Sequence, residues 1–328
     1  MSFDTLKLDK GLYTSGKGFT KALEEIDSSE NYKGTELDGL DAYERQLKRY
    51  NIKVSGPNSD TVSKFFQNSN SATLFPEYVS RAVKLGLNNN ILEDIVATTT
   101  VVDSLDYRSI ACEDAEIATP DSAVINEGTY IPETTIKTKD TLTKLYKHGK
   151  SISASYEALK NQRLDVFTIA LKQIGTYITN CDMQNALDLL YRTSSKVDLI
   201  SKAIINYDDF INAWKTLAPY EMNTIIAEKS MVGDILKIQE FKDANAGLTF
   251  HGTGKLVTPL GANLVYPITD VITNCVIALD KRYALERVQC GDIVTDFDKL
   301  IDRQLEMATV TCISGYNRLM DSASIVLR

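Results

Sequence analysis

The sequence is poor in the residues on which most enzyme sites depend. It contains only two histidines and one tryptophan in 328 residues. His148 and His251 lie about a hundred residues apart and in no H-E-x-x-H pattern, whereas a metal site needs several ligands at close spacing. The sequence also contains no G-x-S-x-G nucleophile elbow. We therefore expect no catalytic, cofactor-binding or metal-binding residues, and no enzymatic activity.

Positive charge and long apolar runs are also in short supply. The 36 basic residues are outnumbered by 44 acidic ones, giving a net charge of -8. Tight binding to phosphate backbones requires clustered Lys and Arg, so any relation to nucleic acid is expected to be containment or weak contact. No run of eighteen apolar residues occurs, and the first residues do not resemble a signal peptide. These absences predict a chain that neither spans a membrane nor is exported by a signal peptide.

Five cysteines are scattered along the chain without a C-x-x-C pair. An odd, dispersed set is typical of reduced thiols that pack as small apolar side chains in a cytosolic compartment. The residues concerned are Cys112, Cys181, Cys275, Cys290 and Cys312.

Three further patterns suggest chemistry but have simpler interpretations. The Gly252-Thr253-Gly254-Lys255 segment lacks the first Gly and the final Ser or Thr of a phosphate loop, so a turn is favoured. The acidic pair Asp208-Asp209 and the cluster Glu113, Asp114 and Glu116 are typical of helix first turns and solvated loops. The aromatic residues between 65 and 78 recur at helical spacing, which indicates a core or an interface.

The N-terminal quarter has mixed charge and many turn formers. We interpret residues 1–60 as an arm with small helices and no core, including a helix over 40–50. Apolar spacings of three and four predict two short helices within 59–85, with Pro76 in the first turn of the second. The β-branched residues within 91–110 predict a strand.

Residues 124–155 form a polar segment rich in Thr and Lys, with the alternation of β-strands. Asp140-Thr141 is a candidate turn between two arms of a hairpin. Both faces are too polar for burial in a monomer's core, and an isolated hairpin is marginal in water. Neighbouring subunits are therefore the expected packing partners.

A long helix is predicted to follow over 164–190, which would be about 40 Å long. Gly175 in its middle costs roughly 1 kcal/mol relative to Ala unless close packing compensates, so we expect another element to cross tightly there.

The remaining third of the chain predicts a mixed α+β block. Helices are expected over 207–217 and 230–241, and strands over 223–227, 255–257, 262–266 and 275–280. A helix over 297–307 is expected to lead into a strand over 308–314.

Several short motifs in this order resemble the major capsid proteins of tailed bacteriophages, which share the HK97 fold. Glu127-Gly128 followed by Ile131-Pro132 resembles the start of that family's extended loop, and residues 147–159 (KHGKSISASYEAL) resemble its exit into the spine helix. Glu286-Arg287-Val288, the strand 309–313 and residues 320–327 (MDSASIVL) are similar to the family's C-terminal stretch.

The resemblance implies an α+β, HK97-like capsid fold with an N-terminal arm, an extended β-hairpin loop, a long spine helix, and peripheral and axial domains. It assigns 1–70 to the arm with short helices, 71–123 to the arm and a strand, and 124–153 to the extended loop. Residues 154–200 would form the peripheral domain with the spine helix, and 201–290 the axial domain. Residues 291–328 would return to the peripheral domain and supply the C-terminal strand.

The resemblance also implies a function. The chain is expected to assemble into hexamers and pentamers of an icosahedral shell around phage double-stranded DNA, with portal and scaffold proteins as partners, no cofactor and no membrane. Its expected location is the virion capsid, and the host cytoplasm during assembly. The intersubunit contacts are assigned to the extended loop, at Glu127, Gly128, Lys137, Lys139, Lys144 and Lys147. Some family members crosslink subunits through a loop Lys, but no partner Asn is evident here.

Three alternatives stay open. An encapsulin-type nanocompartment would use the same fold to enclose protein cargo. A phage tail sheath or tube subunit would form helical tubes, and a cytosolic α+β enzyme with an unrecognised site would be a monomer with a deep polar pocket.

Overall fold

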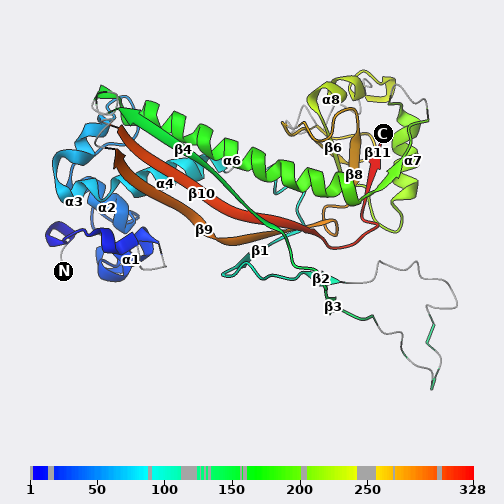
Figure 1. The fold of residues 1–328 in the computed structure, drawn as a ribbon, viewed down its shortest axis with the longest axis horizontal. Helices are drawn as coiled ribbons and strands as arrows, with labels where there is room; N and C mark the ends of the chain where they lie inside the picture. Colours follow the sequence, from blue (N-terminus) through cyan, green and yellow to red (C-terminus); the bar gives the residue numbers. More distant parts are fainter. Residues whose placement is uncertain are drawn as a thin grey trace. The chain divides into compact units, whose positions relative to one another are not determined.

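A computed structural model describes residues 3–13, 18–87, 91–111, 124–125, 127–128, 131, 134–155, 157, 161–200, 205–241, 256–268, 270–300 and 305–328. The chain divides into two units, each built from three separate stretches of sequence. The first contains residues 1–88, 149–178 and 293–311, and the second contains residues 89–148, 179–292 and 312–328. Several long elements contribute residues to both units (Figure 1).

Short helices form the N-terminal part of the first unit. They are η1 (Phe3–Thr5), η2 (Lys10–Tyr13), α1 (Phe19–Ile26), η3 (Ser29–Tyr32), α2 (Ala42–Arg49), η4 (Val62–Gln67), α3 (Ser69–Ala72) and α4 (Phe75–Leu87). The expected helices over 40–50 and within 59–85 are confirmed, and Pro76 lies in the first turn of α4.

The expectation that residues 1–60 lack a core is wrong. Apolar side chains from α1, from α2 and from the connection that follows η1 are buried, among them Leu6, Phe19, Leu23 and Leu47. Each helix is so short that its apolar face holds only two or three residues, which gives a weak periodic signal. Together these faces bury enough apolar surface to make a small core.

The spine helix α6 (Leu164–Thr193) is confirmed, and Figure 1 shows it as one unbroken green helix. The expected tight crossing at Gly175 is also confirmed. A Cβ atom on Gly175 would lie 2.2 Å from the carbonyl oxygen of Val83 in α4, and one on Gly86 would lie 2.1 Å from the carbonyl oxygen of Lys172. Two glycines therefore allow the backbones of α4 and α6 to touch.

Four strands form a sheet in the order β1-β9-β10-β4, which we call the long-strand sheet. Their bounds are β1 (Thr98–Val102), β4 (Leu145–Ser155), β9 (Leu285–Leu300) and β10 (Leu305–Arg318), and β1 runs parallel to β9.

The helix expected over 297–307 is wrong, because residues 297–300 and 305–307 belong to β9 and β10. Asp292, Val294 and Asp296 are exposed whereas Ile293 and Thr295 are half-buried, which is the two-residue period of a strand. The apolar residues within 297–307 also fit helical spacing, so the local pattern does not choose between helix and strand. Pairing between the long strands β9 and β10 favours the strand.

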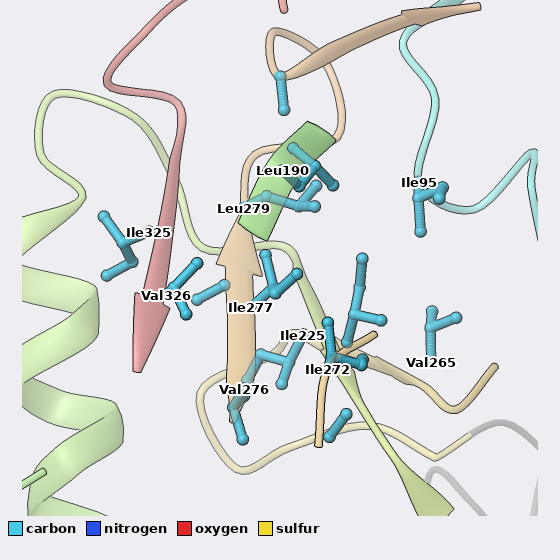
Figure 2. Packing of buried hydrophobic residues seen from close by; sticks show 14 of the residues in the cluster. Ile95, Leu190, Ile225, Val265, Ile272, Val276, Ile277, Leu279, Ile325 and Val326 are labelled. Atoms are coloured by element: carbon cyan, nitrogen blue, oxygen red, sulfur yellow. The ribbon is translucent and has the colours of Figure 1, made fainter. Parts of the chain in front are cut away.

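A five-stranded sheet in the order β5-β11-β8-β6-β7 lies in the second unit. Its strands are β5 (Ser195–Val197), β6 (Thr224–Ala227), β7 (Asn263–Val265), β8 (Val276–Leu279) and β11 (Ser324–Leu327), accompanied by α7 (Tyr207–Thr216), α8 (Lys229–Ile235) and η5 (Gln239–Phe241). Figure 2 shows the core around this sheet, in which Leu190 of α6 packs with Ile225, Ile277 and Val326. The helices predicted over 207–217 and 230–241 and the strands predicted over 223–227, 262–266 and 275–280 are confirmed in type. Of the strand predicted over 255–257, the structure shows only an isolated bridge between Val257 and Asn263, and Lys255 lies outside the described residues.

The C-terminal strand is present, but its assignment to the peripheral part is corrected. β11 pairs in parallel with β5 and antiparallel with β8, so it lies inside the five-stranded sheet. All four of its residues are buried. Three of these residues, Ile325, Val326 and Leu327, are apolar, and such a strand is stabilised inside a sheet where its side chains are buried on both faces.

Candidate intersubunit arm

The polar segment that precedes the spine helix, residues 124–155, is here called the arm, and its first strand pairs with a strand that the sequence did not predict as its partner. β3 (Lys137–Thr138) pairs antiparallel with β2 (Ile110–Ala111), and the backbone N–H of Lys139 donates to the carbonyl oxygen of Ser109. The hairpin predicted between 134–139 and 142–147 is therefore wrong in its pairing, although the chain does bend at Asp140-Thr141. Sequence alternation identifies a strand but carries no information on which strand pairs with it.

The second half of the segment rests on its own chain. Lys139 Nζ donates to the carbonyl oxygen of Arg318 at 2.5 Å, and Thr143 is buried with its N–H bonded to the carbonyl oxygen of Tyr107. Residues 145–155 are strand β4, at the edge of the long-strand sheet next to β10. The expectation that this whole segment is too polar to rest on its own body is thus wrong from residue 137 onward. A strand needs only backbone pairing on one side, and its polar side chains can face solvent.

Glycines permit this close seating of β4. A Cβ atom on Gly315 would lie 2.3 Å from the carbonyl oxygen of Lys144, and one on Gly149 would lie 2.7 Å from the carbonyl oxygen of Val310. Any larger residue at these positions would push the two strands apart.

One buried carboxylate fixes the stretch that leads to β2. Glu286 of β9 accepts hydrogen bonds from Thr100 Oγ1 at 2.6 Å, from the Tyr107 hydroxyl at 2.7 Å and from the Ser109 hydroxyl. Burial and the hydrogen bond to Glu286 raise the pKa of Tyr107. The base of the arm is therefore held by a charged acceptor with three donors, and such bonds are stronger than neutral ones.

A second buried carboxylate fixes the spine helix. Asp182 of α6 is 1% exposed, accepts from Arg287 Nη2 at 2.7 Å and from Ser314 Oγ at 2.6 Å, and so connects the helix to β9 and β10. Sequence reasoning identified neither Asp182 nor Glu286 as a structural residue. The available signal for Asp182 was an acidic residue on the apolar face of a predicted helix.

In contrast to this anchored base, the first half of the arm is exposed. All eight described residues between 124 and 136 are exposed, including Glu127 and Gly128. Gly128 has a φ of +84°, a conformation that favours glycine, so the chain turns there.

Large apolar side chains are concentrated on the exposed arm. Of the 21 exposed large hydrophobic residues in the described part of the chain, six lie on the arm (124–155) and three more lie on the stretch 101–110 that leads to it. They are Val101, Leu105, Ile110, Val124, Ile125, Ile131, Ile136, Leu142 and Tyr146. Isolated exposed apolar residues are ordinary, but a concentration along one segment is typical of a surface that contacts another protein.

The lysines predicted as contact residues divide into two groups. Lys137, Lys144 and Lys147 are exposed, and none has an ion pair with another described residue. Lys139 is half-buried and holds its own chain through Arg318. Three cations therefore project from the arm beside the apolar residues, which is an arrangement suited to an acidic and partly apolar partner surface.

The groups that might support catalysis have structural roles where the structure describes them. His148 Nε2 lies 2.7 Å from Asn185 Nδ2 of α6. Asp209 accepts from the backbone N–H groups of Asn206 and Ile200, so it caps α7 as its first-turn position suggests. Burial raises the pKa of the Cys275 and Cys312 thiols to about 11, with the charges of Glu228 and Asp182 adding to the effect, and these thiols stay protonated.

Other candidate groups lie outside the described residues. They are His251, the segment 252–255, the acidic cluster 113–116 and Cys112. Among the described residues no cluster of His, Cys, Asp or Glu could hold a metal ion. No helix in the described ranges has the length and hydropathy needed to cross a membrane.

One cavity, of about 900 Å³, lies beside α7 and α8. Its described lining includes Asp208, Asp234, Lys237 and Arg328 but no His, Ser, Thr or Cys, and Lys237 and Asp234 already pair with each other at 2.8 Å. The described lining therefore contains no Ser, Thr or Cys nucleophile activated by a His.

No protein-family model and no curated protein matches the sequence. Solved structures do match the fold. A virus-like particle from Pyrococcus furiosus has a TM-score of 0.51 at 14% identity, over 77% of this chain and 98% of that chain. The capsid of a native GTA particle gives 0.52 at 13% identity, over 72% and 88% of the two chains, and the capsid of cyanophage P-SCSP1u gives 0.51 at 11% identity, over 72% and 86%.

These neighbours are all subunits of closed protein shells, and they define the class of fold. The chain has the α+β, HK97-like capsid fold, so the resemblance stated from the sequence is confirmed at the level of fold.

Proposed function

We propose that the chain is a major capsid protein that assembles into hexamers and pentamers of an icosahedral shell around double-stranded phage DNA. The observation that carries the proposal is the arm, which has a firmly held base, a tip (124–136) that exposes apolar side chains, and exposed lysines on the stretch that follows the tip. A monomeric protein gains nothing from such a segment, whereas a shell subunit can bury it on a neighbour.

In this mechanism the tip of the arm, residues 124–136, lies over an adjacent subunit. Lys137, Lys144 and Lys147 pair with acidic residues there, and Glu127 and Gly128 shape the turn. Many weak contacts of this kind, repeated over a closed lattice, stabilise the shell through multivalency. In this lattice we assign residues 124–153 to the extended loop, residues 154–200 together with β10 to the peripheral domain, and residues 201–290 together with β11 to the axial domain.

The remaining parts of the proposal follow from the shell function. Portal and scaffold proteins are the expected partners during assembly, which would occur in the host cytoplasm before the subunit resides in the virion capsid. DNA would be contained by the shell without a dedicated binding site, consistent with the net charge of -8. The protein would act without cofactors and without turnover chemistry.

Charge reversal tests the role of the arm. The triple variant Lys137→Glu, Lys144→Glu and Lys147→Glu should remain a folded, soluble subunit but should form few shells, because like charges would then face each other at the contact. A control triple variant, Lys21→Glu, Lys53→Glu and Lys215→Glu, changes the net charge equally at exposed positions outside the arm. Negative-stain microscopy and sedimentation measure the yield of shells. Wild-type yields from the arm variant would refute the assigned contact.

The same preparations separate the alternatives. Closed shells that enclose protein cargo and no nucleic acid would indicate a nanocompartment, and helical tubes would indicate a tail subunit. A monodisperse monomer under all assembly conditions, with or without a candidate scaffold protein, would favour an enzyme.

A further inference from the structure

The N-terminal residues 3–67, which we call the N-terminal segment, have an internal polar centre at Arg45. This side chain is fully buried, and its Nε lies 3.0 Å from Asp27 Oδ2. Its Nη1 donates to Ser29 Oγ at 2.8 Å and to the carbonyl oxygen of Leu40 at 2.7 Å, and its guanidinium lies 4.5 Å from the centre of the Tyr32 ring. A buried, fully paired Arg of this kind fixes the connection between α1 and α2 in one arrangement.

The N-terminal segment is tied to helix α4 through two side chains of its own. The Tyr13 hydroxyl donates to the carbonyl oxygen of Thr73 at 2.8 Å and accepts from the N–H of Glu77 at 3.0 Å, at the start of α4. Thr20 Oγ1 donates to Glu77 Oε1 at 2.7 Å. The bond from the N–H of Glu77 satisfies one of the backbone donors in the first turn of α4, which have no partner within the helix.

Arg81 of α4 completes this attachment. Its Nη2 lies 2.6 Å from Asp41 Oδ2 at the start of α2, and its guanidinium lies 4.3 Å from the centre of the buried Tyr43 ring. The same Nη2 donates to Thr20 Oγ1 at 3.0 Å. One cation on α4 therefore contacts both α1 and α2.

The N-terminal segment also holds the start of the spine helix. The N–H of Leu164, the first residue of α6, donates to the carbonyl oxygen of Asp60 at 2.8 Å, and the N–H of Val62 donates to the carbonyl oxygen of Gln162 at 2.9 Å. Phe65 is fully buried, with its ring 5.5 Å from that of Tyr78 of α4, and Tyr78 donates to or accepts from Thr168 of α6 at 2.7 Å. The segment thus supplies both an acceptor for the first turn of the spine and part of the core beneath it.

Resting on the capsid function proposed above, these contacts bear on whether the N-terminal segment is removed from the finished subunit or kept in it. We propose that the N-terminal segment is a permanent clamp, retained in the finished subunit, that holds α4 and the start of the spine helix together. Its loss would leave the N–H of Leu164 without its acceptor, Arg81 without Asp41, and the aromatic faces of Tyr78 and Phe75 without Phe65.

A specific cut tests the clamp on the single subunit, independently of assembly. The turn at 55–58 is exposed, so a protease recognition sequence inserted between Ser55 and Gly56 should be accessible. After cleavage, residues 1–55, which carry Tyr13, Thr20 and Asp41, should co-migrate with the rest of the chain in size-exclusion chromatography under native conditions, with both pieces identified by mass spectrometry. Residues 56–67 remain with the larger piece, so this cut tests the attachment of the clamp to α4. Release of this fragment, whether the remainder stays soluble or precipitates, would overturn the proposal.

Variants at the attachment sharpen the test. The double variant Tyr13→Phe and Arg81→Met, made in the cleavable chain, should release the fragment at least tenfold faster. It removes the hydrogen bonds of Tyr13 and the ion pair of Arg81 with Asp41 while keeping the apolar surface, and a loss of about 1.4 kcal/mol in binding free energy corresponds to a factor of ten. Arg192→Met is the matched control, since Arg192 pairs only with Asp188 of its own helix at an exposed position and should leave release unchanged. Equal release rates for the double variant and the control would contradict the assigned attachment.

A measurement on assembled material completes the test. The intact mass of subunits taken from shells made in the natural host should include the N-terminal segment. Shells built only from subunits that lack it would overturn the proposal while leaving the capsid function itself intact.

Discussion

The tight crossing of α4 and α6 makes a prediction whose sign opposes the usual rule for glycine in a helix. Replacing a helical Gly by Ala ordinarily stabilises a protein by about 1 kcal/mol, because Gly loses more backbone freedom on folding. At Gly175 the added Cβ would lie 2.2 Å from the carbonyl oxygen of Val83 and 2.9 Å from the Cα of Gly86. Both obstacles are backbone atoms, which cannot rotate away.

The magnitude follows from the separation that the methyl group would force. Relief of a 2.2 Å contact requires the helices to move apart by about 1 Å, and a gap of that size forfeits up to about half of the dispersion energy across the contact. Overpacking of this kind costs about 1–3 kcal/mol, and rigid backbone obstacles place Gly175→Ala near the upper end. After the gain in helix propensity is subtracted, we expect a net loss of about 2 kcal/mol.

Urea denaturation of unassembled subunits measures this loss. With a slope near 2 kcal/mol per molar, the midpoint of the transition that reports on the first unit should fall by about 1 M. Gly233→Ala in α8 is the matched control, because a Cβ there meets nothing within 4 Å, and it should be neutral or should raise stability by up to about 1 kcal/mol. If Gly175→Ala behaved like this control, the close packing of α4 and α6 would be refuted.

Three further outcomes are expected. Glu286→Ala should destabilise the second unit by about 2–4 kcal/mol, because three hydrogen-bond donors lose a charged acceptor. Amide hydrogen exchange over 98–109 should become faster, and unchanged exchange there would contradict the anchoring role. Burial alone would raise the pKa of Asp280, but hydrogen bonds from Arg282, from the N–H of Glu221 and from Asn223 outweigh it and lower the pKa below 3.8. The resulting stabilisation of the fold is present above pH 3.8 and is lost as the pH falls through the pKa of the folded state, so Asp280→Asn should flatten the acid unfolding curve. An unaltered curve would argue against that linkage. In native subunits at pH 7, a thiol reagent should react slowly with the buried Cys275 and Cys312 and faster with the half-buried Cys181 and Cys290, and peptide mapping locates the label. Rapid modification of Cys275 and Cys312 would contradict their burial.

Long, regular elements were predictable from the sequence because their signals are local. The 3.6-residue spacing over 164–190 gave the spine helix, and the unfavourable Gly175 correctly indicated a close crossing. The polarity of the arm likewise indicated a segment with an exposed tip. It did not indicate that from residue 137 onward the arm contacts its own chain.

The errors come from interactions between distant parts of the chain. Residues 297–307 satisfy both helical and strand spacing, and the choice of strand depends on pairing within the long-strand sheet, which no local pattern reveals. The strand that pairs with β3 lies earlier in the sequence and not across the adjacent turn: Thr138 pairs with Ile110, which is 28 residues before it. The carboxylates of Asp182 and Glu286 acquire their roles only when strands and helix bring their donors together.

The most direct test of the capsid function is a cryo-electron microscopy reconstruction of particles formed by the full-length chain, with a scaffold protein where one is needed. We predict a closed shell of hexamers and pentamers in which residues 124–136 of each subunit lie on an adjacent copy. A reconstruction in which those residues pack on their own subunit, or a preparation that yields no ordered assembly under any condition, would contradict it.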